Sequence, residues 1–271
     1  MKKDPLYLAL RHGTVRKANE LIQSSRFYFS AQQQKILLYI ISQIKPNDKE
    51  FSKYSFYIPD FCRVCGIDVS GKNYKDLKDS ILGIRNAGFW LTRPDGKMRT
   101  VAWIKDAEID PGDGMINIWL HEDMVPYLLQ LRANFTQYEL IYTLSFRSKY
   151  TIRLYELIKS VHYHPLESYQ REFTVDELRE RLGVEAESYQ KYKDFKKRVL
   201  LVGVNEINEY SDKIIEMEEV LRGKKVISVI FKIETKSTLE TLKIKDSIDR
   251  EMGLDPDQVT LWDQLQAGGH V

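Results

Sequence analysis

The stretch FTVDELRERLGV (173–184) decides the fold of this 271-residue chain. Thr174 stands directly before a run with helical spacing, and Glu177 follows three residues later, so their side chains can form a capping box at the start of a helix. Gly183 comes at the end of the run, and glycine is the residue that most readily takes the left-handed conformation that ends a helix. The stretch therefore predicts a short helix with defined ends.

This stretch has a counterpart earlier in the chain, and so do the stretches on either side of it. Three pairs match with offsets of 116 to 118 residues, measured at Tyr39 and Tyr155, at Gly66 and Gly183, and at Tyr74 and Tyr192. The pairs are QQQKILLYIISQI (32–44) with KYTIRLYELIKSV (149–161), FYIPDFCRVCGI (56–67) with FTVDELRERLGV (173–184), and YKDLKDSIL (74–82) with YKDFKKRVL (192–200). Chance similarity among common helical patterns is the alternative, but the nearly constant offset favours two copies of one module.

Each copy reads as three helices followed by a β-hairpin. In the second copy the third helix is expected at about 188–209, and two alternating strands flank the turn at Gly223. In the first copy a hairpin turns at 94–96, and a second turn at 110–114 returns through 115–120. The sequence thus predicts an α+β fold of two tandem winged helix-turn-helix domains related by an internal repeat. The expected parts are a domain at 1–134, a domain at 135–236 and an acidic tail at 237–271.

Composition and charge are those of an ordinary globular protein, with 43% hydrophobic and 30% charged residues. The longest apolar run, 36–41, is far shorter than the roughly 20 residues that cross a bilayer, and the N-terminus has no signal-peptide pattern. Cys62 and Cys65 are the only cysteines, which suits a reducing compartment. We expect a cytoplasmic protein without a membrane partner. The net charge of +2 hides an acidic end, with four basic and seven acidic residues from Lys236 onward.

Some residues resemble parts of catalytic or metal sites. His162 and His164, with Tyr189 or Tyr192, are what a metal-dependent DNA nickase could use. However, histidines two residues apart share a face only on a strand, and here they follow a helical pattern without an acidic ligand nearby. The segment 66–73 has Asn73 where a phosphate loop needs Ser or Thr, and the Cys62–Cys65 pair lacks a second pair for zinc. The prediction is a protein without catalytic residues, metal or cofactor; a rolling-circle nickase remains the alternative from another class.

Basic side chains gather on the third helix and on the hairpin of the second copy. Tyr192, Phe195 and Val199 can face the core, while Lys193 with Lys197 and Lys191 with Arg198 can face outward. A helix with an apolar back and a cationic front can enter the DNA major groove, although a solvated lysine face is the plainer interpretation. The hairpin adds Arg222, Lys224 and Lys225. In the first copy the corresponding candidates are Lys72, Lys75 and Lys78 on the helix and Arg93 and Lys97 on the hairpin, where Asp76 and Asp79 dilute the charge.

Taken together, these stretches resemble the iteron-binding plasmid replication initiators, the Rep proteins with two winged-helix domains. The resemblance runs from about Lys17 to Thr235 and is carried by their order and spacing. The stretches are ANELIQSSRFYFSAQQQKIL (18–37), SKYTIRLYELIKS (148–160), FTVDELRERLGV (173–184), YKDFKKRVLLVGVNEINEYSD (192–212) and RGKKVISVIFKI (222–233).

The resemblance implies a division of work. The second domain would make the main sequence-specific contacts with double-stranded DNA, with Lys191, Lys193, Lys196, Lys197 and Arg198 as candidate contacts. The first domain would mediate dimerisation and touch the rest of each repeat. Dimers would repress the initiator's own gene, and monomers would bind repeated sites and promote melting. The protein would recruit the host initiator and the replicative helicase. A tandem winged-helix transcription regulator that binds one inverted repeat is the nearest alternative, and a scaffold without nucleic acid is another.

The tail carries a separate resemblance. QVTLW (258–262) is similar to the short peptide by which replication proteins dock on the bacterial sliding clamp, with Gln258, Leu261 and Trp262 as anchors. The alternative is a tail helix that packs Trp262 and Leu265 on the body of the protein.

Overall fold

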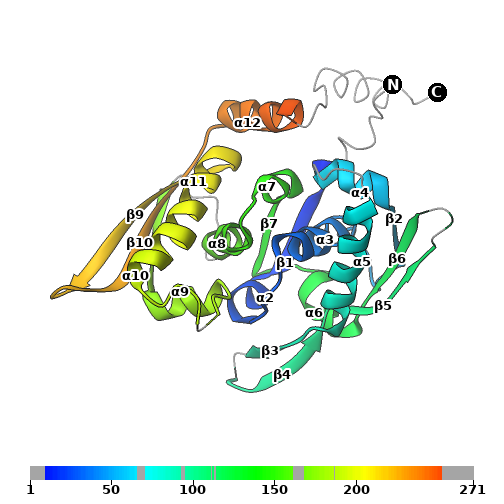
Figure 1. The fold of residues 1–271 in the computed structure, drawn as a ribbon, viewed down its shortest axis with the longest axis horizontal. Helices are drawn as coiled ribbons and strands as arrows, with labels where there is room; N and C mark the ends of the chain where they lie inside the picture. The colour runs from blue at the N-terminus through cyan, green and yellow to red at the C-terminus, as the bar shows by residue number, and fades with distance from the viewer. Residues whose placement is uncertain are drawn as a thin grey trace.

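The fold is seen in a computed structural model, which describes residues 10–65, 71–92, 95–110, 112, 114–160, 168–185 and 187–251, without the side chains of 71–73 (Figure 1). The candidate clamp peptide at 258–262, His162, His164 and Arg93 lie outside this part of the chain. No helix in the described ranges is both long enough and apolar enough to cross a bilayer.

The second copy contains the predicted winged-helix elements. Helix α8 (Lys149–Lys159) is followed by α9 (Val175–Arg181), and strands β9 (Lys213–Arg222) and β10 (Lys225–Thr235) pair as the predicted hairpin. The capping box of α9 is confirmed, because the Glu177 amide donates to the Thr174 hydroxyl at 3.1 Å and the Thr174 amide donates to the Glu177 carboxylate at 2.9 Å. Gly183 has a φ of +68°, as the prediction of a left-handed helix end requires.

The first copy follows the same order. Its helices are α3 (Ala31–Ile41), α4 (Ile58–Cys65) and α5 (Gly71–Asn86), and its hairpin consists of β3 (Gly88–Thr92) and β4 (Met98–Ala102). The second turn joins β5 (Ile104–Ile109) to β6 (Met115–Leu120), which also pairs with β2 (Tyr54–Tyr57). A 3₁₀ turn, η1 (Glu122–Met124), and the short helix α6 (Val125–Leu128) then lead out of the copy.

Each copy also contains strands that the helical patterns did not predict. Strand β1 (Thr14–Ala18) leads into α2 (Asn19–Ser24), and strand β7 (Phe135–Glu139) leads into α7 (Leu140–Ser145). Strand β8 (Ser168–Thr174) precedes α9 and pairs with β10, as β2 precedes α4 in the first copy. Each copy therefore begins with a strand and a helix that the matching stretches did not include: β1 and α2 in the first copy, and β7 and α7 in the second.

The two copies are joined through their first strands. β1 and β7 pair antiparallel, with Arg16 opposite Gln137, the middle residue of each strand. The Arg16 guanidinium also donates to the Gln137 side chain at 2.7 Å. Equivalent strands that pair at equivalent residues are related by a local twofold axis, which fits a duplicated module. The division of the chain at residue 134 stays a prediction, and the first strand after it pairs back with the first copy.

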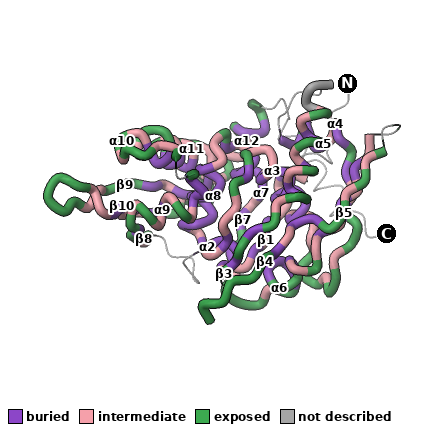
Figure 2. The backbone as a smooth tube through the Cα atoms, turned by 60° about the horizontal axis from the view of Figure 1, so that its bottom comes forward, coloured by how far each residue is buried: buried purple, intermediate pink, exposed green. Residues whose placement is uncertain are grey.

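Helix α8 lies at the centre of a core that runs through both copies (Figures 1 and 2). Every residue from Tyr150 to Ile158 is buried. The helix packs against α2 and α3 of the first copy and against α11 (Leu201–Tyr210) of the second. This confirms that the helix at 149–161 belongs to the core. At the crossing with α11, a β-carbon on Gly203 would lie 2.9 Å from the Leu154 side chain, so glycine permits the close approach.

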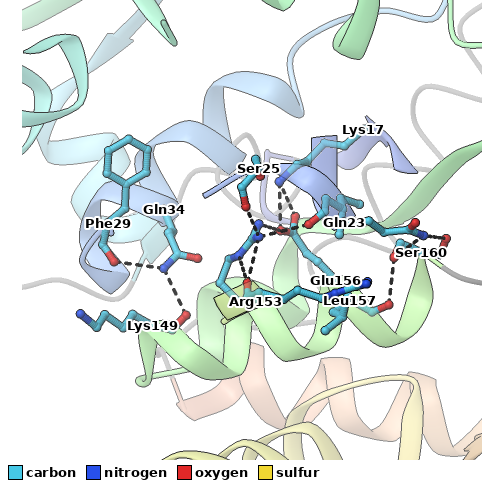
Figure 3. Close-up of polar contacts among 12 residues, drawn as sticks. Lys17, Gln23, Ser25, Phe29, Gln34, Lys149, Arg153, Glu156, Leu157 and Ser160 are labelled. Atoms are coloured by element: carbon cyan, nitrogen blue, oxygen red, sulfur yellow. Dashed lines mark hydrogen bonds and ion pairs between the residues drawn. The ribbon is translucent and has the colours of Figure 1, made fainter. Parts of the chain in front are cut away.

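A buried cluster of charges lies where α8 meets the first copy (Figure 3). The Lys17 ammonium on β1 contacts both carboxylate oxygens of Glu156 on α8, at 2.7 and 3.0 Å. The Tyr138 hydroxyl on β7 donates to the same carboxylate at 2.5 Å, and Arg153 lies 3.8 Å from it. Burial lowers the pKa of Lys17, an effect that Glu156 opposes. The side chains of Lys17 and Glu156 are only 4% and 1% exposed, so the pair is shielded from solvent.

Arg153 extends this cluster to backbone groups. Its guanidinium donates to the carbonyls of Ile22 in α2 and of Arg181 at the end of α9, each at 3.1 Å. Gln23 donates to the Ser160 carbonyl at 2.8 Å, one helical turn further along α8. The cluster therefore connects β1, α2, β7, α8 and α9, and so holds the two copies together.

The last described helix, α12 (Thr238–Glu251), lies over α11 and α7 (Figure 1) and contacts the first copy through His12. It packs on α11 and α7, with Ile248 buried. Asp249 accepts from the His12 ring at 2.9 Å, and the Lys245 ammonium donates to Glu139 at 2.6 Å. Part of the segment expected as an acidic tail is thus a packed helix that is held by ion pairs.

The contact of His12 with α12 predicts a pH dependence of stability. Burial of the ring opposes protonation, but the hydrogen bonds to Asp249 and Glu139 prevail and raise the pKa of His12 to about 9. Because the folded pKa lies above the unfolded value of about 6.5, the contribution of protonated His12 is complete below pH of about 6.5 and is lost as the pH rises through about 9. When the pH is raised from about 6.5 to about 9, we expect the melting temperature of the wild type to fall by more than that of His12→Gln. Equal falls in a thermal unfolding experiment would contradict this assignment.

Candidate nucleic-acid interface

The third helix of the second copy begins later than predicted, at Tyr192 instead of about 188. Tyr189 has a left-handed φ of +50°, which interrupts a helix. The Arg179 guanidinium on α9 donates to the carbonyls of Ser188, Tyr189 and Gln190 and so holds these three residues in the turn. A single side chain therefore fixes the turn between α9 and the third helix. The sequence pattern did not distinguish this turn from a helix.

The third helix itself has three parts. A single turn, α10 (Tyr192–Phe195), continues into a π-helical turn, η2 (Lys196–Leu200), and then into α11. A π turn has i→i+5 hydrogen bonds, so it changes the angular spacing of its side chains, and such turns are frequent at functional sites. Phe195 and Val199 are buried as predicted, with exposed fractions of 0% and 1%, while Tyr192 is half-buried. We refer to residues 192–210 as the recognition helix.

Four predicted cations are exposed at the start of the recognition helix. Within the described part of the chain no ion pair holds any of the four, which are Lys191, Lys193, Lys197 and Arg198. Lys196 differs from them, because its ammonium lies 2.9 Å from the Glu219 carboxylate on β9. The apolar back and the cationic front expected from the sequence are therefore present, with Lys196 set apart.

The wing of the second copy carries further exposed cations. Arg222, Lys224 and Lys225 are exposed around the turn at Gly223, whose φ of +63° suits glycine. These three residues line an open groove of about 890 Å³ together with Arg179 and Tyr192. The groove lies between the wing, the start of α9 and the start of the recognition helix.

Among the candidate DNA contacts, the first copy has fewer exposed basic residues without an ion pair than the second copy. Lys75 and Lys78 are exposed on α5, and Lys97 is exposed at the wing, where its ammonium lies 4.0 Å from the Asp95 carboxylate. Arg99, on the same wing, is ion-paired with Asp123. The side chain of Lys72, like Arg93, lies outside the described residues. Among the candidate contacts, the structure thus places the larger group of free basic residues on the second copy.

The residues considered for catalysis do not form a site in the described ranges. The Tyr192 hydroxyl donates to Glu219 at 2.7 Å, and the ring of Tyr189 packs against Tyr150 with 6.2 Å between centroids. No group of three or more potential metal ligands occurs among the residues the structure describes. Cys62 and Cys65 are buried in α4, and burial raises the pKa of the Cys65 thiol to about 12. Tyr189 and Tyr192 therefore have structural contacts, and Cys65 is a poor nucleophile.

Comparison with known proteins supports this description of the fold. Residues 14–159 match the family model described as Initiator Replication protein, WH1, and residues 174–233 match the model described as Initiator Rep protein, WH2. A replication initiation protein of Escherichia coli is 25% identical over 234 residues, which are 81% of this chain and 69% of that protein. The matched models describe initiator proteins and not enzymes, so the nickase alternative is not supported.

Two solved structures are similar in fold. The Pi initiator protein, crystallised in complex with iteron DNA, has a TM-score of 0.69 and 16% identity, with 84% of this chain and 99% of that chain covered. Domains 2 and 3 of RctB give a TM-score of 0.44 and 13% identity, with 76% of this chain and 81% of that chain covered. The two family models therefore establish the family of this chain, and the similarity to the Pi initiator supports its fold of two winged-helix domains. The chain belongs to the family of Rep initiator replication proteins with WH1 and WH2 domains.

Proposed function

We propose that this protein initiates plasmid replication by binding repeated sites, iterons, at the plasmid origin through its second winged-helix domain. The observation that carries the proposal is the set of exposed basic residues of that domain: four without an ion pair at the start of the recognition helix, and three at the wing that line a groove with Tyr192 of that helix. Phosphate contacts from such residues supply affinity, and side chains in the major groove supply sequence recognition. The fold similarity to the Pi initiator supports this assignment.

The other parts of the proposal follow from family membership. The first domain, at 1–134, mediates dimerisation and adds DNA contacts from Lys72, Lys75, Lys78, Arg93 and Lys97. The second domain, at 135–236, adds contacts from Arg222, Lys224 and Lys225 at its wing. Monomers promote origin melting and recruit the host initiator and the replicative helicase in the cytoplasm, and dimers repress the protein's own gene. The tail, at 237–271, docks on the sliding clamp through Gln258, Leu261 and Trp262.

Footprinting on the DNA that flanks the gene tests the proposal directly. We expect evenly spaced protection over several direct repeats, without strand cleavage in the presence of magnesium. Protection of one inverted repeat would instead favour a transcription regulator. An absence of protection at any site would contradict DNA recognition altogether.

Lys193→Ala combined with Lys197→Ala is expected to weaken DNA binding. Each phosphate contact contributes about 0.9 to the salt slope, so losing two lowers the slope by about 1.8 and the affinity about thirtyfold at 0.15 M salt. Fluorescence anisotropy over a range of salt concentrations measures both quantities. Lys49→Ala with Lys53→Ala is the matched control, because these exposed lysines are also four residues apart but lie in a loop of the first copy. An unchanged slope in the first double variant would place the DNA-binding surface elsewhere.

A further inference from the structure

Among the five candidate contacts at 191–198, Lys196 is the one whose side chain pairs with the wing. Its ammonium lies 2.9 Å from Oε1 of Glu219. The Tyr192 hydroxyl, one turn earlier on the helix, donates to the same oxygen at 2.7 Å. A single carboxylate oxygen of the wing therefore accepts from two side chains of the recognition helix.

The position of Glu219 in the sheet explains this contact. Along β9, Ile215, Met217 and Glu219 share the side of the strand that faces the body of the domain, with Ile215 buried and Met217 packed against the core. Glu219 is the last member of this row before the exposed end of the wing, and it lies opposite Val229 of β10. The contact between the wing and the recognition helix is thus apolar at Ile215 and Met217, and it ends at the charged Glu219, next to the groove proposed to bind DNA.

The pair has the chemistry of a phosphate contact. Hydrogen bonds from Tyr192 and Lys196 hold the pKa of Glu219 below its usual range, so the carboxylate is charged at neutral pH. Both side chains are partly exposed, 35% for Lys196 and 25% for Glu219, and an ion pair at such exposure contributes little to folding stability. An anionic carboxylate oxygen accepts from an ammonium as a phosphate oxygen does. DNA and Glu219 would therefore compete for the same cation.

We propose that Glu219 masks Lys196 and so sets the level of sequence-independent DNA binding by the recognition helix. The inference rests on the proposed DNA-binding function. Phosphate contacts supply essentially all of the affinity for non-specific DNA, and a genome presents a large excess of such sites. Withholding one cation lowers that affinity without removing any residue that could read a base. Lys196 then acts as an anchor of the wing, and the unpaired cations of the recognition helix make the phosphate contacts.

The test is the salt dependence of binding to a random-sequence 30-base-pair duplex. Glu219→Gln in the full chain is expected to steepen the salt slope by about 0.9, because Lys196 becomes free to contact one more phosphate. This corresponds to about fivefold tighter binding at 0.15 M salt. Glu218→Gln is the matched control: it removes the same charge from the neighbouring residue, whose partner Lys232 lies on β10 and not on the recognition helix. The control is expected to change the slope by less than half as much.

Lys196→Ala completes the test and needs no change at Glu219. Lys196→Ala alone is expected to leave the salt slope at the wild-type value. Combined with Glu219→Gln, it is expected to cancel the increase in slope that Glu219→Gln causes alone. The inference is overturned if Glu219→Gln and Glu218→Gln behave alike, or if Lys196→Ala alone lowers the slope by about 0.9. Wild-type protein without any salt-dependent binding would instead overturn the proposed function, so the two failures are distinguishable.

Discussion

Replacing Glu156 with alanine is expected to destabilise the protein by about 3–5 kcal/mol, because the change leaves buried cations without their counter-charge. Lys17 has both carboxylate oxygens of Glu156 as partners, and Arg153 lies beside them. All three side chains are at most 4% exposed, so water cannot replace the lost carboxylate. The Tyr138 hydroxyl also loses its acceptor.

Urea unfolding of wild-type and variant proteins measures this loss. Glu180→Ala is a suitable control, because its ion pair with Arg26 is partly exposed and is expected to be worth less than about 1 kcal/mol. Lys17→Met combined with Glu156→Leu removes one of the two buried cations together with the carboxylate and is expected to recover only part of the stability, because Arg153 stays buried without a counter-charge. A loss below 1 kcal/mol for Glu156→Ala would show that the cluster is accessible to solvent.

Replacing Phe195 with alanine is expected to cost about 3–5 kcal/mol and to abolish specific DNA binding. The Phe195 ring is fully buried on the inner side of the recognition helix, and the Arg179 guanidinium lies 4.6 Å from the ring centroid. Arg179 also fixes the turn before the recognition helix, so a cavity at Phe195 removes the support of the turn as well as of the helix.

The two effects of Phe195→Ala are measured separately, by urea unfolding and by anisotropy at a temperature where the variant remains folded. Phe195→Leu is the control, since a smaller change in volume is expected to leave a smaller cavity and most of the affinity. An alanine variant that unfolds at the wild-type urea concentration would show that the ring is not part of the core.

Much of the fold was predictable because the decisive signals are local. The capping residue Thr174 and the helix end at Gly183 need only neighbouring residues, and the duplicated spacing repeats those signals in the first copy. The buried charges were not predictable in this way. Arg153 and Glu156 stand between the apolar positions of α8, as solvent-facing charges do, and they are buried only because the first copy packs on that side of the helix.

The candidate site was predictable in part for the same reason. The spacing of Phe195 and Val199 correctly indicated the buried side of the recognition helix, and the charges on the other side are exposed. The role of Lys196 depends on Glu219, which is 23 residues away on a strand of the wing, and no local spacing connects the two. The π turn and the late start at Tyr192 likewise depend on tertiary contacts, and whether the exposed cations bind DNA is still a prediction.

The pairing of β1 with β7 has a consequence for how the protein is made. Thr14 is paired with Glu139, so β1 leaves the ribosome long before its partner strand is synthesised. Domains of a nascent chain usually fold one after another from the N-terminus, and pairing across a long sequence separation is slow. Here the first winged helix is completed only when the opening strand of the second repeat has emerged. Lys17 must wait for Glu156 as well, so translation itself couples the folding of the two halves.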